Sequence, residues 1–423
     1  MRGCLKGSET GWKKVFLCVF LVTLLLAGVA WGASQNEVPK DRRASEVLPA
    51  NQISGPHFQV GDRVMADGYM YRFIVNSDYG SFVVTGEYGL RKLLKEIQAI
   101  TSLKGVNKGQ ALVEGVKDKS RETLEFAGSL VTAPRDTLRS VPTGVSKLFS
   151  NISTGMKAAP NPRQDTRAQE VLKVSDAKRK IAFDLGVDVY SSNMVLQKEL
   201  DGLGKAQALG ALGVSAAIPY GGGSVVSLSR GGRTAGEVNR LLRDESPAGL
   251  SNLNERKLLN MGVDRGLVQR FLNHRAFTPR HQTVMVACLE KLSGAKGREA
   301  FIQFALAADN EDTANFFQNM AEILRGYHET VSPIIEIRVP GVLAARAANG
   351  TALVPYPLDY AVWSVRAERV VKNSLAGLKA GKRPPAKIEL WVTGQVSPRF
   401  RQQLKDQGIQ VVEKVDRRVG LMD

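Results

Sequence analysis

Between positions 57 and 86 the chain alternates apolar and polar residues with a period of two, which predicts short strands with one buried face. Asp67-Gly68 and Asp78-Tyr79-Gly80 break this pattern where hairpins need positive φ angles. The period then changes to that of a helix, with apolar residues at Leu90, Leu93, Leu94, Ile97 and Ile100. Residues 56–105 are therefore expected to form a small antiparallel β-meander followed by a helix that covers its apolar face.

Helical spacing of apolar residues continues through residues 106–156, with breaks at Pro134 and Pro142, and predicts amphipathic helices. Their charges are interleaved, whereas helices that bind membrane surfaces carry a strongly basic polar face. Packing on the protein or on a partner is therefore favoured, and lipid contact is the alternative. The polar, proline-containing residues 157–166 predict a linker.

Residues 167–332 are predicted to form a helical domain. Ser246-Pro247 and Thr278-Pro279 each place a capping hydroxyl before a proline, at the position where a helix needs no backbone donor. Apolar residues between these two caps, and after the second one, recur every three or four positions. This pattern favours antiparallel helices joined by short loops.

Residues 333–423 predict a small α/β module. Two strands folded at Asn349-Gly350 precede a helix, and a strand, a helix and a strand follow. The last two strands, joined through a helix, are expected to run parallel. The whole pattern predicts an α+β, predominantly helical fold class: an N-terminal antiparallel β-meander with a helix, a helical middle and a C-terminal α/β module.

One stretch, positions 206–229, carries no charge between Lys205 and Arg230. Its apolar part is shorter than the roughly 20 residues that a membrane span needs, so a buried helix with a glycine loop is favoured. The alternative is a membrane-inserting hairpin, whose contacts with lipid would come from Leu209, Leu212, Val214 and Ile218. A phosphate-binding loop is least favoured, because the glycines lack that motif's spacing to lysine.

The first 32 residues have the layout of a secretory signal peptide: a basic leader, an apolar core and small residues at the expected cleavage point. An uncleaved membrane anchor is the alternative. Residues 33–55, polar and without a period, are interpreted as a linker. The predicted location is therefore the periplasm or the extracellular space, with membrane association as an option. Cleavage would leave Cys288 alone, and its spacing from Val284 and Leu292 predicts a core position.

The common catalytic and metal-binding motifs are missing from the sequence. The histidines lack the spacing of zinc ligands and are interpreted as surface or capping residues. The acidic run Asp309–Thr313 lacks the arrangement of a calcium loop and is interpreted as a solvated helical turn. No nucleophile elbow is present. We therefore expect neither a cofactor nor a metal, and assign no catalytic residue.

The best local candidate for ligand binding is the turn between the penultimate strand and its helix. Anions bind where parallel strands end and helix amides point outward. The predicted anion-binding residues are Thr393, Gly394, Ser397, Arg399 and Arg401. The alternative is an ordinary strand-to-helix turn with a serine cap.

The formal net charge of +17 predicts affinity for polyanions in general. Export makes an intracellular nucleic acid an improbable partner, and no basic segment carries interleaved stacking aromatics. The leading hypothesis is an exported, non-catalytic envelope or extracellular interaction protein, whose basic surface contacts anionic lipid or an envelope polymer. A protein partner is a further option. The alternatives are a secreted hydrolase with a site built from distant residues, and a membrane-perturbing protein that inserts residues 206–229.

Overall fold

The computed structural model describes residues 36–114, 174–208, 232–379 and 384–422. Within it, Val38–Asp423 form one compact unit. The predicted signal peptide (1–32), most of the predicted amphipathic helices (115–156) and the predicted linker at 157–166 lie outside the described residues. So do the predicted membrane-contact residues Leu209, Leu212, Val214 and Ile218. Those predictions remain predictions.

The N-terminal sheet is antiparallel, as expected. Its strands are β1 (Arg42–Arg43), β2 (Ser54–Gly55), β3 (Phe58–Val60), β4 (Arg63–Ala66), β5 (Tyr71–Ser77) and β6 (Gly80–Thr85). β6 pairs along the whole length of one edge of β5, and β3 and β4 share the other edge. Gly68 and Gly80 have positive φ angles in the two predicted hairpin turns.

Residues 42–55 are ordered and belong to the sheet, which corrects the interpretation of residues 33–55 as a linker. They include β1 and β2 and two short helices, α2 (Ala44–Val47) and α3 (Ala50–Ile53). Ala44 and Leu48 are buried in the core of the sheet. The segment is too short and too polar to show a period, so only its pairing with β3 and β4 gives it structure.

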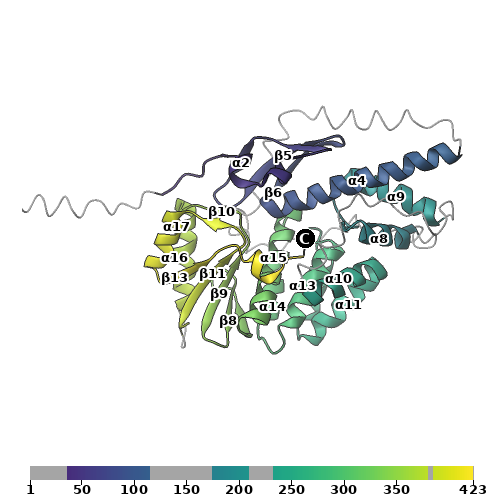
Figure 1. Ribbon diagram of the computed structural model, residues 1–423. Helices are drawn as coiled ribbons and strands as arrows, with labels where there is room; N and C mark the ends of the chain where they lie inside the picture. The colour runs from purple at the N-terminus through teal and green to yellow at the C-terminus, as the bar shows by residue number, and fades with distance from the viewer. Residues whose placement is uncertain (1–35, 115–173, 209–231, 380–383, 423) are drawn as a thin grey trace, which may run out of the picture. The chain divides into compact units, whose positions relative to one another are not determined.

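Helix α4 (Gly86–Glu114) connects the sheet to the rest of the molecule (Figure 1). The predicted stripe is buried, but it divides between two apolar clusters. Leu90, Leu93 and Ile97 pack with the sheet. Ile100 and Leu103, one and two turns further on, belong to the larger core shared by the helices and the C-terminal sheet.

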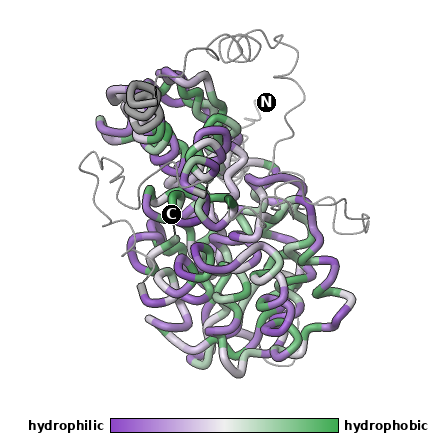
Figure 2. The backbone as a smooth tube through the Cα atoms, turned by 90° about the vertical axis from the view of Figure 1, so that its right-hand side faces the viewer, coloured by the Kyte–Doolittle hydropathy of each residue, from purple (hydrophilic) through white to green (hydrophobic). Residues whose placement is uncertain are grey.

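The middle region is helical, as predicted. Its helices are α8 (Val174–Asp184), α9 (Met194–Ala208), α10 (Gly232–Asp244), α11 (Pro247–Asn260), α12 (Arg265–Leu272), α13 (Pro279–Lys291), α14 (Arg298–Ala305) and α15 (Glu311–Thr330). Ser246 caps α11 and Thr278 caps α13, which confirms both predicted caps. Hydrophobic and hydrophilic residues alternate along the helical tubes in Figure 2, as expected for helices with one buried face. Cys288 is fully buried in α13.

The C-terminal sheet has the order β13-β11-β9-β8-β7. β7 (Ile334–Arg338), β8 (Ala344–Ala347) and β9 (Thr351–Tyr356) are antiparallel, whereas β9, β11 (Lys387–Val392) and β13 (Ile409–Val412) are parallel, as predicted for the last two strands. β10 (Tyr360–Ala361) pairs with β12 (Gln395–Val396). The helices of this part are α16 (Val365–Lys379), α17 (Pro398–Asp406) and α18 (Asp416–Val419).

The segment that carries Asp359 connects the C-terminal part to the N-terminal sheet, through three backbone hydrogen bonds to Gly68 and Tyr69 and through one buried side chain. Asp359 lies in the connection between β9 and β10, and its carboxylate accepts hydrogen bonds from the backbone of Tyr71 (2.8 Å) and of Glu87 (3.0 Å). Glu87 lies in the first turn of α4, so Asp359 caps this helix from 272 residues away in sequence. The predicted α+β, predominantly helical class is therefore confirmed, but its three segments share one unit.

Among the described residues, no helix combines the length and the apolar character needed to cross a bilayer.

Candidate anion-binding cleft

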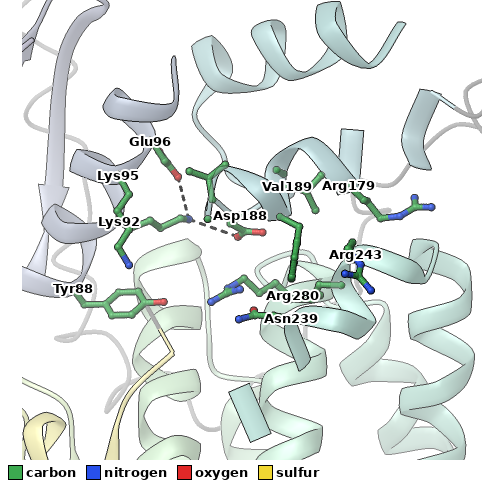
Figure 3. Close-up of a pocket in the computed structure, with 15 residues that line it drawn as sticks. Tyr88, Lys92, Lys95, Glu96, Arg179, Asp188, Val189, Asn239, Arg243 and Arg280 are labelled. Carbon is green, nitrogen blue, oxygen red and sulfur yellow. Dashed lines mark ion pairs between the residues drawn. The ribbon is translucent and has the colours of Figure 1, made fainter. Parts of the chain in front are cut away.

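A cleft lies between α4, α8, α10 and the N-terminal end of α13 (Figure 3). Its empty volume is about 780 Å³, part of which is open to solvent. The charged residues that line it are five basic and two acidic side chains: Lys92, Lys95, Arg179, Arg243, Arg280, Glu96 and Asp188. We refer to this site as the basic cleft. Three of the basic groups, Lys92, Arg179 and Arg243, also pair with carboxylates just outside the lining, those of Glu311, Asp176 and Asp244. The lining itself has an excess of basic groups, which favours an anionic ligand.

The basic side chains come from four different helices. Lys92 and Lys95 are three residues apart on α4, so both project from the same face of this helix. Arg179 comes from α8, Arg243 from the last turn of α10 and Arg280 from the first turn of α13. In Figure 3 these side chains surround the cleft, with Lys92 at one end and Arg179 and Arg243 at the other.

Lys92 is the centre of an ion-pair network. Its ammonium lies 2.6 Å from Glu311 Oε1 and 3.9 Å from carboxylate oxygens of Glu96 and Asp188. Burial disfavours the charged lysine, but these three carboxylates raise its pKa above the ordinary value. Lys92 therefore joins three parts of the chain: α4, α15 and the loop that follows α8. It also keeps its positive charge.

Glu311 is the strongest of these partners. Burial would raise the pKa of its carboxyl, but Lys92 lowers it to about 2. The interpretation of Asp309–Thr313 as a solvated turn needs correction. Asn310 caps α15 through the backbone of Thr313, and Glu311 is mostly buried in the pair with Lys92.

Both oxygens of Glu96 accept hydrogen bonds from the loop between α8 and α9. Its Oε1 accepts a hydrogen bond from Ser191 Oγ at 2.6 Å and its Oε2 accepts one from Asn193 Nδ2 at 3.0 Å. Burial raises the pKa of Glu96, although Lys92 and these two hydrogen bonds oppose the shift. Its role is to hold the loop between α8 and α9 against α4.

The opposite end of the cleft is more exposed. The Arg243 guanidinium lies 4.8 Å from the centre of the Phe183 ring and pairs with the neighbouring Asp244 at 2.6 Å and 2.9 Å. An aromatic face behind a guanidinium holds it in place and leaves its outer edge for an anion. Since Asp244 is exposed to solvent, its pair with Arg243 is a weak competitor for a ligand.

The inner wall is shared with the C-terminal segment of the chain. Arg280 Nη2 and Tyr88 Oη donate hydrogen bonds to the backbone oxygen of Met422, at 3.3 Å and 3.2 Å. The next residue of α13, His281, is buried and hydrogen-bonded at both ring nitrogens, to Thr278 and to Asn315. Burial lowers the pKa of His281 to about 4, so it is a neutral capping residue.

In the predicted anion-binding turn, most of the side chains form hydrogen bonds or ion pairs within the protein. Ser397 caps α17 by accepting a hydrogen bond from the backbone of Phe400. Thr393 Oγ1 donates to the backbone oxygen of Leu358, and Arg401 pairs with Glu413 at 2.7 Å and 2.8 Å. These contacts are those of a capped turn, and they do not test whether an anion binds there.

Gly394 has a structural reason to be glycine. A Cβ atom at this position would overlap the backbone oxygen of Asp359. Glycine at this position therefore allows the backbone after β11 to pack directly against the backbone of Asp359. Arg399, the fifth predicted residue, is half-buried in the first turn of α17. Anion binding by these five residues remains a prediction. The basic cleft has five basic side chains, whereas this turn has two.

Within the described ranges, no three histidine, cysteine, aspartate or glutamate side chains converge in a way that could hold a metal ion.

Comparisons with protein families, with curated proteins and with solved structures found no match for this chain. The function must therefore be argued from the cleft itself.

Proposed function

We propose that this protein is an exported, non-catalytic interaction protein whose basic cleft binds an anionic group of a lipid or an envelope polymer. The observation that carries the proposal is the convergence of five basic side chains from four helices on one cleft. Its empty space of about 780 Å³ is partly open to solvent, so a ligand can reach the basic groups from outside. A head group or a short polymer segment would fit such a site.

Binding is a better interpretation than hydrolysis. A general acid or base needs an atom that can reach the substrate. The side chains of Glu96, Asp188 and His281 are buried and bonded within the protein, which limits their contact with a substrate. The hydrolase and the membrane-perturbing alternatives thus have less support, and the second rests on residues outside the described ranges.

The test measures binding to two anionic probes. Sedimentation with phosphatidylglycerol vesicles, and titration with inorganic polyphosphate, should both detect binding at low salt that weakens as salt increases. Phosphatidylcholine vesicles should not bind. Lys95→Glu combined with Arg243→Glu reverses one charge on each wall of the cleft, and we expect at least a tenfold loss of affinity for the preferred probe.

The matched control is Arg265→Glu combined with Arg338→Glu, which changes the net charge equally. These two arginines are exposed, and neither lines the cleft. The control should bind nearly as well as the wild type. Equal losses in both double variants would mean that general basicity, and not the cleft, is responsible for binding.

A further inference from the structure

A second cavity lies between α16, α17 and the C-terminal sheet, and its character is opposite to that of the basic cleft. It has an empty volume of about 610 Å³. Among the residues that line it, only Ser374, Tyr69 and Tyr356 have polar side-chain atoms; the others are aliphatic or aromatic. The Ser374 hydroxyl donates to the backbone oxygen of Val370, within its own helix. The cavity is thus almost entirely apolar.

The cavity exists because α16 is held by a loop. Gly377 lies so close to Pro340 that a Cβ atom on it would be 2.5 Å from the backbone oxygen of Pro340. This contact fixes the C-terminal half of α16 beside residues 340–342. Val370, Val371 and Leu378 then face the sheet without full burial. Part of the space beside them is open to solvent.

The shape of the cavity is elongated. Its lining on α16 runs from Ala367 to Leu378, which is about 16 Å at the helical rise of 1.5 Å per residue. The opposite wall is formed by Ile388 and Leu390, which point to the same face of β11. The other face of this strand is covered by α15, where the rings of Trp391 and Tyr327 are 4.9 Å apart.

The two tyrosines mark one end of the cavity. Arg366 Cζ lies 5.3 Å from the centre of the Tyr69 ring. Burial raises the pKa of Tyr69 to about 12, although Arg366 and a hydrogen bond with Ser364 oppose the shift, so its hydroxyl stays protonated. The Tyr69 and Tyr356 rings are 6.0 Å apart. Arg366, which does not itself line the cavity, thus lies against one of the two tyrosines that do.

We propose that this cavity binds a single acyl chain, whose acidic head group lies at the end marked by Tyr69, Tyr356 and Arg366. An elongated apolar cavity with a few polar groups at one end is the arrangement that suits an amphipathic ligand. This site is separate from the basic cleft, with which it shares no lining residue.

The experiment uses cis-parinaric acid, a polyunsaturated fatty acid that fluoresces in an apolar environment. The wild type should bind one molecule per chain saturably. Val370→Trp fills the cavity from α16, and Ile388→Phe fills it from β11; each should weaken binding at least tenfold. The control is Val365→Trp, on the same helix but 58% exposed and outside the cavity, which should bind like the wild type.

The head-group position is tested separately. Arg366→Ala should weaken binding of the acid but not of its methyl ester. The cleft double variant Lys95→Glu/Arg243→Glu should bind the probe like the wild type, which separates this proposal from the proposed function. Absence of saturable binding by folded wild-type protein would overturn the proposal. So would undiminished binding by both cavity-filling variants.

Discussion

Replacement of Asp359 by alanine should lower the free energy of unfolding by roughly 2–6 kcal/mol, because two buried backbone donors would each lose their acceptor at about 1–3 kcal/mol. These donors are the amides of Tyr71 in β5 and Glu87 in α4. Asp359 itself is buried. The variant should therefore loosen the N-terminal sheet and the start of α4 together. Urea denaturation followed by circular dichroism measures the change.

Two variants sharpen this prediction. Asp359→Asn keeps one acceptor oxygen and should fall between the wild type and alanine. Asp62→Ala removes an exposed carboxylate from the same sheet and should change stability by less than about 0.5 kcal/mol. If Asp359→Ala were as stable as Asp62→Ala, the carboxylate would not contribute to joining the two sheets.

Replacement of Glu322 by alanine should lower the free energy of unfolding by roughly 2–6 kcal/mol, because two buried donors would each lose their acceptor at about 1–3 kcal/mol. Glu322 is fully buried in α15. Its Oε2 accepts from the backbone of Met422 at 2.5 Å, and its Oε1 accepts from Gln318 at 2.9 Å. Arg325 binds the backbone oxygens of Val419 and Gly420 at 3.2 Å each. The C-terminal segment should therefore detach first.

The control lies on the same helix. Glu329 pairs with the other side of Arg325 at 2.7 Å but is exposed, so Glu329→Ala should cost less than about 1 kcal/mol. Amide exchange of residues 416–422 reports detachment directly. Faster exchange is expected in Glu322→Ala and not in Glu329→Ala. Equal exchange in both variants would mean that the Glu322 hydrogen bond does not hold this segment, and would leave its attachment to Arg325, Arg280, Tyr88 and apolar packing.

The burial of Glu322 also predicts that the stability of the fold depends on pH. Burial raises the pKa of Glu322, and that of Asp359, to about 7 in the folded protein. The folded state thus binds these protons more tightly than the unfolded state, and their contribution to stability is lost as pH rises toward 7 and beyond. His281, with its pKa lowered to about 4, has the opposite effect, but only below its ordinary value of 6.5. Between pH 6.5 and 7.5, stability should therefore fall, and less steeply in Glu322→Gln.

Local patterns predicted the elements of this fold well. The alternation before position 86, the apolar stripe of α4 and the hydroxyl-proline caps of α11 and α13 depend on neighbouring residues, and the structure has them where expected. Residues 42–55 were misinterpreted because their order comes from pairing with β3 and β4. The role of Asp359 was not predicted, since its partners are more than 270 residues away in sequence.

The basic cleft could not be found from the sequence for the same reason. Lys92, Lys95, Arg179, Arg243 and Arg280 form no motif, and each is an ordinary basic residue of an amphipathic helix. The only local sign is the spacing of Lys92, Lys95 and Glu96 on one face of α4. The turn at 393–401 could be predicted because a strand end, a helix start and two arginines follow one another in the sequence, and whether it binds an anion remains a prediction.

Hydrogen–deuterium exchange with and without inorganic polyphosphate tests most directly whether anions bind in the basic cleft. The cleft predicts slower exchange in peptides that cover residues 88–96, 179–189 and 239–243. Peptides that cover residues 393–401 should not change. Protection confined to the 393–401 turn, or no protection in a complex that demonstrably forms, would contradict the account.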